Sequence, residues 1–144
     1  MSTMDRPLRL SVLGLIVTVT ASPHPMSRGN QEVGLVETGS HRMFVHCSGK
    51  ANAPSVILEA GTNDTSEVWS AVQKQVEQFK HVCIYDRLGL GKSDKLAVEH
   101  TADEIVADLH QLLHAAFVPA PYVLVGHSIG GIYVRTPSFI LQKS

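Results

Sequence analysis

Residues 121–131, which read P-Y-V-L-V-G-H-S-I-G-G, constrain the fold of this chain more than any other stretch. Residues 122–125 are apolar and rich in β-formers, which suits a strand buried on both faces of a parallel sheet. The sequence G-H-S-I-G follows at once, and the residues after it are able to start a helix. A strand, then G-x-S-x-G, then a helix is the context of a nucleophile elbow, whose sharp turn holds a serine hydroxyl above the sheet. We therefore predict such an elbow at Ser128, rather than an ordinary glycine-rich turn.

Extended and helical patterns alternate along the chain that precedes this stretch. Residues 32–38 and 41–47 look extended and are joined by Gly39-Ser40, which predicts a hairpin. Further on we expect a strand at 56–58, a helix at 69–79, a strand at 81–85 and a helix at 101–116. Strands that alternate with helices indicate a parallel sheet with helices on both faces.

Two possible capping boxes mark where the helices begin. Asp64 and Glu67 precede the first helix, in which Trp69, Val72, Val76 and Phe79 recur at helical spacing. Thr101 and Glu104 precede the second helix, one face of which is apolar: Ile105, Leu109, Leu112, Leu113 and Ala116.

The composition excludes several classes of protein. The chain has 144 residues, 44% of them hydrophobic, and a formal net charge of −1, which fits one domain. Without an excess of basic residues, neither nucleic acid nor an anionic membrane is expected as a partner. The only cysteines are Cys47 and Cys83, so the chain is not a disulfide scaffold.

Residues 1–21 resemble a secretory signal peptide. Arg6 and Arg9 precede the apolar run 10–20, and V-T-A at its end suits cleavage after Ala21. The run is shorter than the ~20 residues that span a bilayer, so we expect no stable membrane span. We expect a protein of the secretory pathway, and the alternative location is the cytoplasm. The alternative to a signal peptide is an N-terminal strand. Residues 22–32 read as a flexible linker.

Two further patterns invite a cofactor or metal interpretation, which their spacing does not support. The glycine-rich loop 86–93 ends in G-K-S, but Asp86 stands where a P-loop needs its first glycine. The dinucleotide fingerprint fails as well, because Asp94 occupies the place of its third glycine. His110 and His114 are four residues apart on an expected helix, without a third ligand at suitable spacing. We therefore expect no cofactor and no metal.

Three motifs in this order resemble the N-terminal half of the α/β-hydrolase superfamily. V-I-L-E-A-G-T at 56–62 resembles its third strand and oxyanion loop, and Y-D-R-L-G-L-G-K-S at 85–93 resembles the loop after its fourth strand. V-G-H-S-I-G-G at 125–131 resembles its elbow. The resemblance implies a partial three-layer α/β/α domain at 33–144 with a mostly parallel sheet, without the C-terminal strands of the family.

The resemblance also implies a role for three residues. Ser128 would be the nucleophile, and the backbone N–H groups of Ile129 and Thr62 would stabilise the oxyanion that forms on the substrate. The implied activity is hydrolysis of a small ester or similar acyl substrate through an acyl-enzyme. Relatives often carry His-Gly in the oxyanion loop, whereas this chain has Ala60-Gly61 preceded by Glu59.

The chain departs from the family after Ser128. The triad order there is serine, acid, histidine, but residues 129–144 contain no acidic residue and no histidine. Pro137 interrupts the expected helix, and residues 135–144 form an atypical tail. We interpret the chain as a truncated form of a longer hydrolase. The alternative is a catalytically inactive fragment or pseudoenzyme that acts as a binding partner.

None of the four histidines at 100, 110, 114 and 127 is nominated as the base. We expect the side chain of His127 to point away from its neighbour Ser128, and we expect His100, His110 and His114 to lie on or near a helix that packs away from the elbow.

The family's topology has two further implications. The strand at 122–125 would become an edge strand, so we expect low solubility of the isolated chain. The second and fourth strands would be neighbours, which brings Cys47 near Cys83. We expect two unpaired thiols in the core, with a disulfide after export as the alternative.

Overall fold

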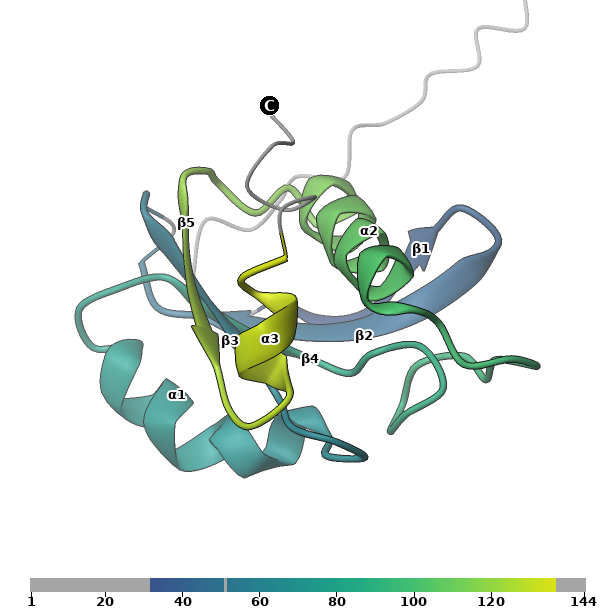
Figure 1. Cartoon of the computed structure of the whole chain (residues 1–144). Coiled ribbons are helices and arrows are strands. Elements are labelled where there is room, and N and C mark those ends of the chain that lie inside the picture. Colours follow the sequence, from purple (N-terminus) through teal and green to yellow (C-terminus); the bar gives the residue numbers. More distant parts are fainter. Residues whose placement is uncertain (1–31, 51, 137–144) are drawn as a thin grey trace, which may run out of the picture.

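The computed structural model describes residues 32–50 and 52–136, which form a five-stranded sheet with helices on its two faces (Figure 1). The predicted signal peptide, nearly all of the linker and residues 137–144 lie outside the described residues. In chain order the elements are β1 (Glu32–Thr38), β2 (His41–Ser48), β3 (Ser55–Glu59), the 3₁₀ helix η1 (Ser66–Trp69), α1 (Ser70–Val76), β4 (Val82–Tyr85), α2 (Ala102–Ala115), β5 (Tyr122–Gly126) and α3 (Gly130–Tyr133).

The first two strands form the predicted hairpin. β1 and β2 are antiparallel, and Thr38 pairs with His41 across a two-residue turn. Gly39 takes a φ of 70° in this turn, a conformation that glycine adopts without strain. The predicted hairpin is therefore confirmed.

The strand order in the sheet is β1-β2-β4-β3-β5. β2 is antiparallel to both of its neighbours, whereas β3 is parallel to β4 and to β5. Four strands therefore run in one direction and β2 runs in the other, which confirms a mostly parallel sheet. Because the carboxyl ends of β3, β4 and β5 meet at one edge, the loops that follow these strands are brought together there.

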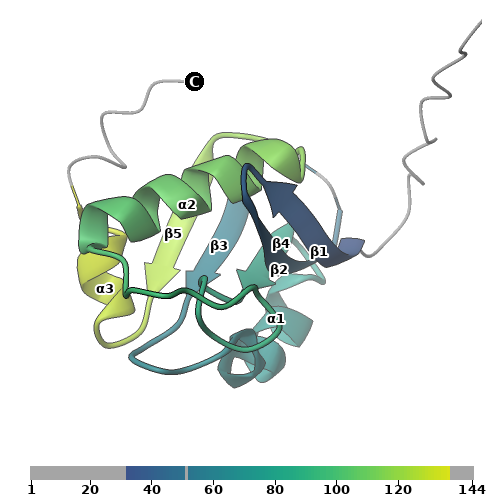
Figure 2. The ribbon, with the colours of Figure 1, turned by 90° about the vertical axis from the view of Figure 1, so that its right-hand side faces the viewer.

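The sheet lies between two helical layers, with α2 and α3 on one side and α1 on the other (Figure 2). α2 begins with the predicted capping box of Thr101 and Glu104. It buries Val106, Leu109, Leu112 and Leu113, and the last three join the core that Met43, Val45 and Ile57 supply from the sheet. No helix in the described part of the chain has the length and apolar character that spanning a membrane requires.

The helix predicted at 69–79 differs from the structure. Thr65 is the N-cap of η1 and makes no side-chain cap, so the capping box of Asp64 and Glu67 is wrong. The buried carboxylate of Asp86 instead accepts a hydrogen bond of 2.6 Å from the N–H of Ser66. This long-range contact satisfies an N–H at the start of the segment, in place of a local cap. α1 then ends at Val76, which leaves Phe79 outside the helix and exposed.

β5 is an edge strand among the described residues. Tyr122 and Leu124 pack against the core below α2, but Val123 and Val125 are 45% and 37% exposed. The prediction that this strand is buried on both faces is therefore wrong in the described residues. The physical reason is that side chains alternate across a strand, and α1 packs over β4 rather than over β5.

Cys47 and Cys83 form a disulfide bond, so the expectation of two unpaired thiols is wrong. The expected adjacency of β2 and β4 is confirmed, because Cys47 of β2 lies directly opposite Cys83 of β4 in the antiparallel register. Directly opposite residues of neighbouring antiparallel strands have their Cβ atoms close enough for such a bond.

Candidate active site

Ser128 occupies the turn between β5 and α3. Its φ of 55° lies in the left-handed region, which residues with a side chain seldom adopt. The N–H of Gly130 donates to the carbonyl of His127 at 2.9 Å, and the N–H of Gly131 donates to the carbonyl of Ser128 at 3.0 Å. These bonds close a tight turn and leave the Ser128 side chain exposed at the carboxyl edge of the sheet. This is the geometry that the elbow prediction requires.

The backbone packs so closely around Ser128 that the flanking positions 126 and 130 have no room for a side chain. A Cβ on Gly126 would lie 2.5 Å from the carbonyl oxygen of Gly130, and a Cβ on Gly130 would lie 2.6 Å from that of Ala60. Both distances are far below van der Waals contact. A Cβ on Gly131 would meet its nearest neighbour only at 3.8 Å. The first and last glycines of G-x-S-x-G therefore permit the close approach of β5, α3 and the end of β3.

The loop after β3 lies against this turn. The N–H of His127 donates to the carbonyl of Glu59 at 3.1 Å. A Cβ on Gly61 would lie 3.3 Å from the Ser128 Cβ and 2.7 Å from a carboxylate oxygen of Asp64. Gly61 is thus the point at which the loop passes beside the serine, and the absence of a side chain there keeps the space open.

Hydrogen bonds from Arg87 hold the loop that follows β3. The guanidinium donates to the carbonyl of Ala60 at 2.8 Å and to that of Gly61 at 2.5 Å. In a trans peptide the N–H lies opposite the preceding carbonyl. The bond to the Gly61 carbonyl therefore turns the N–H of Thr62 away from Arg87.

A buried carboxylate fixes Arg87 in turn. Glu59 is 1% exposed, pairs with the guanidinium of Arg87 and accepts a hydrogen bond from the hydroxyl of Tyr85. Burial raises the pKa of Glu59, while Tyr85 and Arg87 oppose that rise by stabilising the charged form. Burial also raises the pKa of Tyr85 well above its ordinary value, so its hydroxyl stays protonated and donates. The positive charge of Arg87 is therefore neutralised where it meets the loop.

Sequence reasoning missed this network of Glu59, Tyr85 and Arg87. Its signal is a pair of charged residues beside apolar strands: Glu59 ends β3, and Arg87 follows Asp86 after β4. Charged side chains are seldom buried unless they are paired, so this pattern predicts that they meet. Local spacing did not show it, because the two residues are 28 positions apart.

The two N–H groups predicted to stabilise an oxyanion have no hydrogen-bond acceptor among residues 32–50 and 52–136. Neither the N–H of Thr62 nor that of Ile129 donates a hydrogen bond to any described residue. Free backbone donors beside a serine are what an oxyanion hole requires. Their role toward a substrate stays a prediction.

The Ser128 hydroxyl makes no hydrogen bond to a histidine within residues 32–50 and 52–136. The imidazole of His127 is paired instead with Asp64, with 3.8 Å between Nδ1 and Oδ2, and its ring meets the edge of Trp69. Nδ1 of His100 lies within hydrogen-bond distance, 2.7 Å, of the carboxylate of Asp108 in α2. The side chains of His127 and His100 therefore contact Asp64 and Asp108 rather than Ser128.

An open depression borders the serine. Its volume is about 680 Å³, and it is lined by Ser128, Gly131, Ile132, Arg135 and Thr136. Ile132 is 63% exposed there. The depression offers apolar surface beside the hydroxyl for part of a small substrate.

The glycine-rich loop 86–93 has a packing role. The carboxylate of Asp86 accepts hydrogen bonds from the N–H groups of Ser66 and Lys92, the second at 2.9 Å. A Cβ on Gly91 would lie 2.2 Å from that carboxylate. The absence of a side chain at Gly91 therefore lets the loop fold around Asp86.

A sequence model described as the alpha/beta hydrolase family matches residues 43–141. The chain belongs to the alpha/beta hydrolase family. It is 32% identical over 117 residues to "Probable transporter efuK" of Hormonema carpetanum, a match that covers 78% of this chain and 17% of that protein. It is 35% identical over 83 residues to "Putative carbamate hydrolase RutD" of Escherichia coli, which covers 57% of this chain and 31% of that protein.

Solved structures of hydrolases share the fold. The structure of "Est816 as an N-Acyl homoserine lactone degrading enzyme" superposes with a TM-score of 0.64 at 26% identity, and the match covers 70% of this chain and 38% of that one. The alpha/beta hydrolase chain described here therefore spans less than half the length of each of these relatives.

Proposed function

We propose that this alpha/beta hydrolase chain carries the nucleophile of a serine hydrolase, and that Ser128 attacks a carboxylic ester or a related acyl substrate. The observation that carries the proposal is the strained φ of 55° at Ser128, on a turn beside a loop whose Thr62 N–H has no acceptor among the described residues. Strain of this kind persists where function requires it. The names of two relatives, a carbamate hydrolase and a lactone-degrading enzyme, support acyl chemistry as the class.

In the proposed reaction the Ser128 oxygen bonds to the substrate carbonyl carbon while a general base takes its proton. The N–H groups of Ile129 and Thr62 stabilise the negative charge that develops on the carbonyl oxygen. Collapse of this intermediate expels the alcohol or amine, which takes up the proton, and leaves an acyl-enzyme. Water then attacks the acyl-enzyme and releases the acid and free Ser128. The base is a histidine in this chemistry, and no described histidine bonds to Ser128.

A second candidate is a catalytically inactive binding protein or pseudoenzyme. The pairing of His127 with Asp64 favours it, because this pair leaves Ser128 without a base among the described residues. In this case the depression beside Ser128 would bind a small acyl compound without turnover.

A fluorophosphonate probe separates the two candidates. An activated serine is phosphonylated, so we expect stoichiometric labelling of the folded wild-type chain and none of Ser128→Ala. Ser70→Ala, at an exposed serine at the start of α1, is the matched control and should label like wild type. Folded wild type that stays unlabelled would contradict the hydrolase and support the binding protein.

Export of the chain, as predicted from residues 1–21, is part of the same proposal. The disulfide between Cys47 and Cys83 supports it, since disulfides persist in oxidising compartments.

A further inference from the structure

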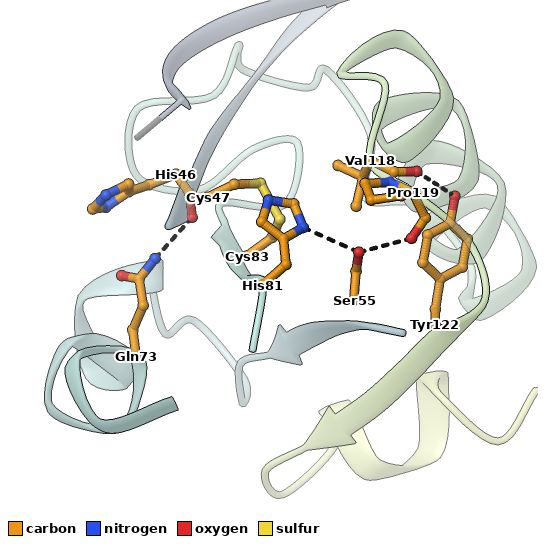
Figure 3. The surroundings of a disulfide bond; sticks show 9 residues. All are labelled: His46, Cys47, Ser55, Gln73, His81, Cys83, Val118, Pro119 and Tyr122. Atoms are coloured by element: carbon orange, nitrogen blue, oxygen red, sulfur yellow. Dashed lines mark hydrogen bonds between the residues drawn. A yellow bond between two sulfur atoms is a disulfide. The ribbon is translucent and has the colours of Figure 1, made fainter. Parts of the chain in front are cut away.

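A second group of reactive side chains lies near the amino end of β4, whereas Ser128 lies at the carboxyl ends of the parallel strands. Cys47 and Cys83 face each other across β2 and β4, and His81 precedes Cys83 by two residues, so its side chain lies on the same face. One ligand atom from each of the three lies within 4.8 Å of the other two, and all three residues are buried (Figure 3). Within the described residues this is the group whose donor atoms are close enough to share a metal ion.

A hydrogen-bond relay fixes the tautomer of His81. The Ser55 hydroxyl donates to the carbonyl of Pro119 at 2.7 Å, because a carbonyl only accepts. The same hydroxyl lies 3.0 Å from Nδ1 of His81, so Nδ1 carries the proton and donates to it. Nε2 therefore holds the lone pair, and Figure 3 shows this nitrogen on the side of the ring toward the disulfide. Metal-binding histidines in proteins are generally held in this way: one ring nitrogen binds the metal, and the N–H of the other donates a hydrogen bond to a second group.

The charges of these groups suit a divalent cation in an apolar site. Cys47 and Cys83 pack among Leu112, Leu113 and Val118 in the main core. With its proton on Nδ1 and its lone pair on Nε2, the His81 imidazole is neutral and able to act as a ligand. Two thiolates and a neutral imidazole around Zn²⁺ have no net charge, so the complex avoids the cost of an unbalanced buried charge. Thiolate and imidazole are also the ligands that Zn²⁺ prefers.

We propose that Cys47, Cys83 and His81 bind one Zn²⁺ per chain when the disulfide is reduced. Reduction by a dithiol transfers two electrons and two protons to the Cys47–Cys83 bond, which yields two thiols and the disulfide of the reductant. Zn²⁺ then displaces the two thiol protons into water and leaves a fourth, tetrahedral position for a water molecule. β2 and β4 are thus cross-linked in either state, by the disulfide under oxidising conditions and by the metal under reducing ones.

Cobalt titration tests the site on the full chain. The protein is reduced with a phosphine under argon and titrated with Co²⁺, a coloured substitute for Zn²⁺. We expect a thiolate-to-cobalt charge-transfer band that saturates at one Co²⁺ per chain and disappears when Zn²⁺ is added. The oxidised chain, in which no thiol titrates, should show no band. Two free thiols in reduced wild type without this band would overturn the proposal.

Variants locate the ligands. Cys83→Ser should lose most of the charge-transfer intensity, and His81→Ala should weaken Co²⁺ binding by more than tenfold. Ser55→Ala, which removes the partner of Nδ1, should weaken it by about 10- to 100-fold. His114→Ala, at an exposed histidine of α2, is the control and should bind as wild type does. Unchanged binding by Cys83→Ser would show that the cobalt occupies another place and would overturn the site.

Thermal unfolding of the wild-type chain tests the proposal without any substitution that could disrupt folding. Zn²⁺ should raise the thermal unfolding midpoint of the reduced wild type and leave that of the oxidised wild type unchanged. If the reduced chain is unfolded without metal, Zn²⁺ should restore its secondary structure in circular dichroism. A reduced chain whose midpoint or secondary structure does not respond to Zn²⁺ would contradict the proposal.

Discussion

The guanidinium of Arg87 joins the buried carboxylate of Glu59 to the backbone of the loop that passes beside Ser128. It pairs with Glu59 and donates to the carbonyls of Ala60 and Gly61. One side chain thus connects the ends of β3 and β4 at the carboxyl edge of the sheet. The position of the Thr62 N–H follows from this connection, since its peptide is held through the Gly61 carbonyl.

We expect Arg87→Met to lower the free energy of unfolding by about 3–5 kcal/mol, because it leaves Glu59 buried without its cation. Glu59→Gln combined with Arg87→Met removes both charges and should cost much less than the single change. Urea unfolding followed by circular dichroism measures both. Arg42→Met is the control: it breaks the exposed pair with Asp94 and should have little effect. Equal losses for the single and the double variant would contradict this account of the buried pair.

We expect Gly130→Ala to lower stability by about 1–3 kcal/mol, because its Cβ would overlap the Ala60 carbonyl oxygen and force the backbone to shift. Gly131→Ala, one residue along the same helix, has room for its Cβ and should be neutral or stabilising. Thermal unfolding of the two variants under one set of conditions makes the comparison. A loss at Gly131 as large as that at Gly130 would mean that close packing is not the cause.

We expect Ser128→Gly to be about 1 kcal/mol more stable than Ser128→Ala, because glycine adopts a φ of 55° without the strain of a Cβ. Ser70 at φ −57° is the control position. There the glycine variant should be less stable than the alanine variant, since glycine is unfavourable in a helix. Chemical denaturation of the four variants gives the two differences, and the same sign at both positions would rule out strain at Ser128.

We expect stability to fall as the pH is lowered below about 6.5, where an unfolded histidine takes up a proton. Burial lowers the pKa of His81 and of His46, so their folded forms stay neutral while the unfolded chain becomes charged. The unfolded state then binds more protons, and the free energy of unfolding falls as pH falls. Urea unfolding between about pH 7.5 and about pH 5.5 measures the slope.

Two substitutions test the origin of that slope. His81→Gln should reduce it, whereas His114→Gln, at an exposed position, should leave it as it is in wild type. A slope that is unaffected by His81→Gln would show that other groups cause the pH dependence.

We expect Val123→Lys to reduce self-association, because it places a charge on the exposed face of the edge strand β5. Val98→Lys is the matched control, since Val98 is 77% exposed but lies in the loop before α2. Gel filtration with light scattering at several protein concentrations measures the association. Equal improvement by both variants would indicate a general effect of charge rather than pairing at the β5 edge.

Much of the fold was predictable from local pattern. The hairpin, the strands β3 to β5 and the helix α2 match their predicted positions closely, because hydrophobic periodicity and turn residues act over a few residues. The capping box at Thr101 is local in the same sense. The predicted start of the first helix failed where a distant residue intervened: Asp86 binds the N–H of Ser66.

In the candidate site, too, the features set by neighbouring residues were predictable and those set by distant residues were not. The glycines at 126 and 130 predicted the tight turn at Ser128, because a Cβ at either position would collide with the backbone. The support from Arg87 and Glu59 was not predicted, because these residues are far apart in sequence and meet only through the pairing of β3 with β4.

The order of strands and helices, the turn at Ser128 and membership of the alpha/beta hydrolase family follow from the amino-acid sequence alone. These features depend on side chains that act within a few residues of one another. Three other features become visible only in the folded chain: Arg87 holds the loop beside Ser128, β5 leaves one face exposed, and Cys47 bonds to Cys83. Each of these depends on which strands become neighbours, and long-range burial and pairing decide that.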